Sequence, residues 1–192
     1  MENLPATPVT GPLTEAERDY IVTALQTTQT LLRDAVDGLS DAQLTFKPGA
    51  DRWSIAECVE HIVLVERGIF RAAQQGIQQI ADSEKRSDIK ISDVDLVKAT
   101  RGRSRHIAAP APFMPTGKYG DTAATLALFD EVRAADINFA QHAEGDLRTH
   151  YFDHFILGPL DLYQALLLIA AHGERHRKQI DDVKAAPGYP QA

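Results

Sequence analysis

Apolar side chains recur at intervals of three and four residues in four stretches of this chain, which is the spacing of an amphipathic α-helix. The stretches are residues 14–39, 54–81, 121–143 and 160–186. The first two begin with a hydroxyl residue followed three positions later by glutamate, a pairing that caps helix N-termini; the pairs are Thr14 with Glu17 and Ser54 with Glu57. The pattern therefore predicts four helices of roughly five to seven turns each.

The connection over residues 82–120 differs from the helices in composition. Charged residues come first, and proline and glycine follow. Long connections within compact domains are uncommon and often functional. We interpret this one as a single long crossover, which covers one end of the molecule and allows the second and third helices to run parallel.

Four long helices without a convincing alternating strand predict an all-α fold, a four-helix bundle. Residues 1–13 carry three prolines and no periodicity, which predicts a flexible N-terminal arm. Residues 14–186 are expected to form one domain, followed by a short tail at 187–192.

Composition and charge narrow the classes of function. The net charge is −7, so nucleic-acid binding gains no electrostatic support, and the basic patch Arg101, Arg103 and Arg105 is read as solvated. The single cysteine excludes an internal disulfide. No apolar run approaches the roughly 18 residues of a membrane span, and residues 1–13 lack the pattern of a signal peptide. We therefore expect a cytoplasmic protein with a small-molecule substrate and no membrane partner.

Two histidines one helical turn apart carry the main chemical signal. His172 and His176 continue the strongly apolar residues 166–171, so their shared face is expected to point inward. Two neutral imidazoles in a core need partners, because each otherwise loses about 1–3 kcal/mol of hydration. A metal ion is one shared partner, and buried hydrogen bonds are the alternative.

A third imidazole is expected on the second helix. His61 has apolar helical neighbours, and bundles build metal sites from side chains on facing helices. The chain holds seven histidines, so spacing alone decides nothing; a second pair, His150 and His154, has the same spacing but no long apolar helix behind it. We assign no metal role to that pair, nor any functional role to His106 or His142. From the residues alone, a three-histidine metal site and three hydrogen-bonded core histidines both stay open.

A zinc peptidase is excluded by the position of Glu174. It lies midway between His172 and His176, at roughly 200° around the helix from the first of them. The peptidase motifs need the glutamate beside one of the two histidines. Glu174 is therefore predicted to be a surface residue.

The assembled motifs resemble those of the DinB-like (damage-inducible) superfamily, over about residues 14–184. The N-terminal motif is Trp53, Ser54, Glu57 and His61, and the C-terminal motif is His172, His176, Gln179 and Ile180. The resemblance implies an up-down-down-up bundle in which these three histidines hold a divalent metal, often nickel or zinc. It also implies a homodimer. Characterised branches of that family include thiol-dependent S-transferases, which use mycothiol or bacillithiol, and a thiol-dependent isomerase.

Further residues near His61 are assigned by weighing each chemical role against a structural one. Glu57 is the candidate catalytic residue, as a general base or as a carboxylate that orients a ligand, and its structural role is helix capping. Cys58 is read as a small buried hydrophobe. Trp53 is read as a packing anchor, Gln179 as a hydrogen-bonding neighbour of the site, and Arg175 as exposed or reaching a carboxylate.

The sequence thus supports three hypotheses about function. The first is a metal-dependent enzyme that activates water or a low-molecular-weight thiol for hydrolysis or S-transfer. The second is a non-catalytic metal-containing bundle that binds a small molecule or serves a stress response. The third is a structural cluster of histidines without an ion.

Overall fold

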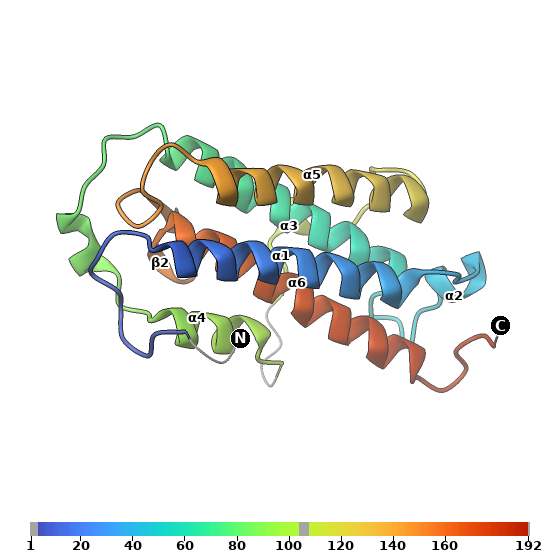
Figure 1. Cartoon of the computed structure of the whole chain (residues 1–192). Coiled ribbons are helices and arrows are strands. Elements are labelled where there is room, and N and C mark those ends of the chain that lie inside the picture. Colours follow the sequence, from blue (N-terminus) through green and yellow to red (C-terminus); the bar gives the residue numbers. More distant parts are fainter. Residues whose placement is uncertain (1–3, 104–107, 192) are drawn as a thin grey trace.

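A computed structural model describes residues 4–103 and 108–191 of the chain, so Arg105 and His106 lie outside the described residues. Four long helices form the bundle (Figure 1). They are α1 (Glu15–Val36), α3 (Ile55–Gly76), α5 (Thr122–His142) and α6 (Leu162–Lys184). The shorter elements are α2 (Asp41–Thr45), η1 (Glu84–Asp88), α4 (Asp93–Arg101), η2 (Ala111–Phe113), β1 (Tyr151–His154) and β2 (Gly158–Asp161).

Capping side chains define where the long helices begin. Both predicted capping boxes are present, at Thr14 for α1 and at Ser54 for α3. Asp121 and Asp161 accept hydrogen bonds from backbone amides in the first turns of α5 and α6. Such caps satisfy amides that have no partner within the helix.

The helices run up, down, down and up, as the resemblance implied. Contacts at the helix ends fix the directions: the side chain of Arg18 with the carbonyl of Ala140, Gly76 with Leu162, and Gly145 with Ile77. The first makes α1 and α5 antiparallel, the second makes α3 and α6 antiparallel, and the third places the ends of α3 and α5 together. The long connection therefore joins two parallel helices.

Helix α6 is buried on more than one side. Residues 166–171 are each at most 5% exposed, because α1, α3 and α4 all pack against this helix. In Figure 1, α4 lies along α6 outside the four-helix bundle. A helix that is apolar all round is expected where neighbours cover it all round, and this explains the uninterrupted run of leucine, isoleucine and alanine.

The connections contain two features that the sequence analysis did not predict. The crossover over residues 82–120 contains α4, whose N-cap Ser92 accepts a hydrogen bond from the amide of Asp95 at 3.2 Å. Two strands also occur where none was expected, since β1 pairs antiparallel with β2 from Tyr151–Asp161 to His154–Gly158. Each strand has only four residues, too few for an alternating pattern to be recognised.

The N-terminal arm and a buried ion cluster close the end of the bundle that holds the hairpin. The amide of Leu13 donates to Asp146 at 3.1 Å, so the arm is attached where it enters α1. Arg148 is fully buried and forms ion pairs with Asp93 at 2.6 Å, with Asp161 at 3.0 Å and with Glu17. These contacts join α1, α4 and α6 to the segment before the hairpin.

A second group of buried charges lies between α1, α3 and α5. The guanidinium of Arg133 donates to both carboxylate oxygens of Glu66 at 2.7 Å, and to the Leu25 carbonyl and the Thr28 hydroxyl at 2.7 Å. Asp136 is fully buried beside this pair. Burial raises the pKa of Asp136 well above its ordinary value, and the Glu66 carboxylate raises it further against the opposing effect of Arg133.

Replacing Asp136 with asparagine is expected to stabilise the protein near neutral pH. The raised pKa means that the folded state holds a proton that the unfolded chain releases above about pH 4. The stabilising contribution of protonated Asp136 is therefore fully present below about pH 4. It is lost as the pH rises through the pKa that Asp136 has in the folded protein. Urea unfolding of Asp136→Asn should show a gain of about 1–3 kcal/mol at pH 7 that shrinks at pH 4. An equal effect at both pH values would contradict the assignment.

None of the helices within residues 4–103 and 108–191 has the length and apolarity required to cross a membrane.

Candidate metal centre

Three imidazoles from two facing helices converge on one point. His61 lies on α3, and His172 and His176 lie one turn apart on α6. One ring nitrogen from each residue lies within 4.8 Å of those of the other two. The ring centroids are 5.1 Å apart for His61 and His172, 4.6 Å for His61 and His176, and 4.5 Å for His172 and His176. The structure therefore brings together the three histidines that the sequence selected.

Hydrogen bonds fix the orientation of two of the rings. Nδ1 of His61 lies 2.7 Å from the carbonyl oxygen of Phe113, and Nδ1 of His176 lies 2.9 Å from Oε1 of Gln179. A carbonyl oxygen only accepts, so each Nδ1 carries the proton and each Nε2 keeps a free lone pair. This arrangement, with one nitrogen bonded to an acceptor and the other free, is typical of histidines that ligate metals. Gln179 thus has the role expected of it.

The cluster keeps its imidazoles neutral. Burial lowers the pKa of His172 well below its ordinary value, and His176 and His61 lower it further. Burial also lowers the pKa of His176, to about 3, and that of His61. Neutral rings can donate their lone pairs at neutral pH, so no proton has to be displaced before a cation binds. His61 and His176 are buried, and His172 is partly exposed.

Trp53 forms one wall of the cluster. Its ring centroid lies 4.6 Å from that of His61 and 6.0 Å from that of His176. It also packs against the core near the start of α3, as expected for an anchor. The position beside two candidate ligands was not predicted.

Glu57 and Cys58 lie on the first turns of α3. The carboxylate of Glu57 accepts from the amide of Ser54 at 2.8 Å and pairs with Lys47 at 2.7 Å, so its capping role is confirmed. Its catalytic role stays a prediction. Cys58 is fully buried, and burial raises the pKa of its thiol to about 12. A thiol that stays protonated is a poor ligand, which agrees with its reading as a small hydrophobe.

The other described histidines are not members of the cluster. His150 is bound through Nδ1 to the carbonyl of Asp146 at 2.8 Å. His154 is in β1, where its Nδ1 accepts from the amides of Ile156 at 3.3 Å and Leu157 at 3.2 Å. His142 is the exposed last residue of α5. None of the three belongs to the group of candidate metal ligands found among the described residues.

Two charged residues near the cluster contact α4 and the residue after it. Glu174 pairs with Arg101 and, at 3.1 Å, with Lys178. Its side chain is only 15% exposed, so the prediction of a surface residue was wrong, because α4 covers that side of α6. Arg175 donates to the backbone carbonyls of Thr100 and Gly102 at the C-terminal end of α4.

Comparison with known proteins identifies the family. A family model of the DinB superfamily matches residues 24–180. The chain belongs to the DinB superfamily. No curated protein matches it closely enough to be significant. One similar solved structure is that of YfiT from Bacillus subtilis, described as a probable metal-dependent hydrolase with an unusual four-helix bundle topology. It is 17% identical, has a TM-score of 0.61, and is matched over 96% of this chain and 98% of its own.

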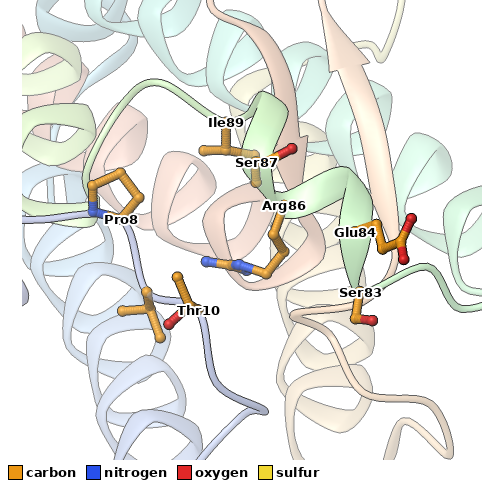
Figure 2. A pocket seen from close by; sticks show the side chains of 8 residues that line it. Pro8, Thr10, Ser83, Glu84, Arg86, Ser87 and Ile89 are labelled. Carbon is orange, nitrogen blue, oxygen red and sulfur yellow. The ribbon is translucent and has the colours of Figure 1, made fainter.

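A separate cavity of about 570 Å³ lies between the N-terminal arm and η1 (Figure 2). Arg86 extends towards Pro8 and Thr10 there, and Glu84 and Ser87 lie at other points of the lining. No histidine lines this cavity. We therefore place the candidate chemistry at the histidine cluster, where the donor groups converge.

Proposed function

We propose that this member of the DinB superfamily is a metal-dependent enzyme whose divalent ion is held by His61, His172 and His176. The observation that carries the proposal is the convergence of the three ring nitrogens within 4.8 Å. A tetrahedral zinc site with Zn–N bonds of about 2.0–2.1 Å separates its nitrogens by about 3.3 Å. Small rotations of the three side chains therefore suffice to close the cluster around one ion.

The donor set fits nickel or zinc. Imidazole nitrogens suit both metals, and three protein ligands leave coordination positions free for a substrate. Bound there, the ion would supply Lewis-acid chemistry, stabilising negative charge on a substrate and making water or a thiol acidic near neutral pH. The chain supplies neutral ligands and an aromatic wall at Trp53.

Hydrolysis and S-transfer are the two reactions that this site supports best. YfiT, the structural neighbour, is described as a probable metal-dependent hydrolase, which favours hydrolysis of a small molecule. S-transfer would need a separate low-molecular-weight thiol, because the thiol of Cys58 is fully buried with a raised pKa. A cytoplasmic location and a homodimer stay predictions.

A paired screen tests the proposal. Nickel- and zinc-loaded protein is incubated with ester and amide substrates in water, and with electrophilic substrates plus mycothiol or bacillithiol. We expect turnover in one arm, reduced by at least about 100-fold in His61→Ala, because the site then lacks a ligand. Equal rates in wild type and His61→Ala would reject the metal-dependent reaction. Tight binding of a test substrate without turnover would favour a non-catalytic bundle.

A further inference from the structure

Residues 110–118, which we call the strap, lie against α3 beside the histidine cluster. The strap includes η2, and the Phe113 ring rests on the backbone of α3: a Cβ added to Gly68 would lie 2.8 Å from the Phe113 Cε1 atom. The carbonyl oxygen of Phe113 is the atom that contacts His61 Nδ1, at 2.7 Å. The position of the strap therefore sets the position of an atom that orients a candidate ligand.

Glu60, the residue before His61, binds the other end of the strap. One carboxylate oxygen accepts from the amides of Thr116 and Lys118, both at 3.1 Å, and the other accepts from the amide of Gly117 at 2.7 Å. The side chain is nearly inaccessible, since Glu60 is 5% exposed. Bonds from amides to an ionised carboxylate are roughly twice as strong as bonds between neutral groups.

The backbone conformation of Gly117 allows the amides of residues 116–118 to donate to the same Glu60 carboxylate. Its φ of +77° lies in the left-handed region, which turns successive amides towards one side of the chain. A non-glycine residue adopts that conformation only with strain, and asparagine is among the residues that tolerate it best. No atom lies within 4 Å of a Cβ at this position, so a substitution tests backbone conformation without a clash.

We propose that Glu60 is a positioning residue: by binding the amides of residues 116–118 it holds the Phe113 carbonyl in place, and that carbonyl orients His61 with Nε2 towards His172 and His176. The proposal rests on the metal site of the proposed function. It adds that α3 supplies the ligand His61 and also, through Glu60, holds the Phe113 carbonyl that orients His61.

A merely structural role for Glu60 predicts a different outcome. If the carboxylate only attached the strap, its loss would lower the stability of the fold and leave the His61 tautomer unchanged in the folded protein. The tautomer can be read directly from the nitrogen chemical shifts of the imidazole, without any metal. The tautomer of His61 therefore distinguishes a positioning role of Glu60 from a role in stability alone.

The first test replaces Glu60 with glutamine, which keeps the size but removes the charge and directs an amide group at backbone donors. In metal-free protein at pH 7, nitrogen-15 NMR should show His61 mainly as the Nδ1-protonated tautomer in the wild type. In Glu60→Gln it should show a mixture of the Nδ1- and Nε2-protonated tautomers. Nickel and zinc affinities should fall about 10- to 100-fold, the usual effect of losing a group that orients a ligand. Glu131→Gln, at an exposed position on α5, is the control and should behave as wild type.

The second test leaves Glu60 intact and strains the strap. Gly117→Ala should reproduce the mixed tautomers and the weaker metal binding, while Gly117→Asn should stay close to wild type. This pair decides the matter even if Glu60→Gln does not fold. Wild-type tautomer or wild-type metal affinity in folded Glu60→Gln or Gly117→Ala overturns the proposal. If wild-type protein takes up no ion, the proposed function fails, and the tautomer measurement alone still decides whether Glu60 positions His61.

Discussion

Replacing His172 with alanine is expected to remove the bound metal. Protein purified without a histidine tag should carry about one nickel or zinc ion per chain, and His172→Ala close to none after gel filtration. The reason is geometric: the site draws all its identified ligands from three side chains, and His172 contacts both of the others. Loss of one ligand should lower the affinity by more than about 100-fold, beyond the 10- to 100-fold typical of an orienting partner.

Two matched substitutions show whether this effect is specific. His150→Ala removes one member of the second pair of histidines spaced four residues apart, His150 and His154. His142→Ala removes an exposed histidine. Both should keep the wild-type metal content, measured by elemental analysis and by titration with zinc. Loss of metal from either control, or retention of metal by His172→Ala, would place the ion elsewhere or show that none binds specifically.

Replacing Arg133 with methionine is expected to cause the largest loss of stability. Arg133 is fully buried, and Glu66, its ion-pair partner, is 2% exposed. Without the guanidinium, the buried Glu66 carboxylate beside Asp136 loses the cation with which it pairs. Removing one partner of such a pair usually costs about 3–5 kcal/mol. Urea unfolding at pH 7 should show this loss as a lower midpoint with an unchanged slope.

Two further variants test the cause of that loss. Arg33→Met breaks an ion pair with Asp130 whose side chains are 45% and 31% exposed, and should cost at most about 1 kcal/mol. The double variant Arg133→Met/Glu66→Leu removes both buried charges and should regain most of the lost stability, since apolar replacements of buried pairs are often neutral or stabilising. A double variant no more stable than Arg133→Met would show that the unpaired carboxylate of Glu66 is not the cause of the loss.

The main helices and the three histidines were predictable because their signals are local. Capping pairs and apolar spacing mark where each long helix begins and which face is buried. Two histidines four residues apart share a face wherever the helix packs. His61 followed from the need for a third ligand on a facing helix, which the contact between α3 and α6 supplies.

The surroundings of the cluster were not predictable, because they join distant residues. The contact of His61 with Phe113 spans 52 positions, and Arg133 binds Glu66 across 67. A single arginine or glutamate in a helix reads as exposed unless its partner is known. Helix α4 was missed because its sequence is mainly polar, although Ser92 followed by Asp95 marked its start.

Anomalous X-ray diffraction from crystals of the untagged protein, recorded at the absorption edges of nickel and zinc, would show directly whether one ion binds between His61, His172 and His176. We expect one strong peak per chain, at about 2.0–2.1 Å from Nε2 of His61, Nε2 of His176 and one ring nitrogen of His172 if the ion is zinc. A cluster without a peak, in protein soaked with either metal, would contradict the proposed metal site, as would a peak bound only by other residues.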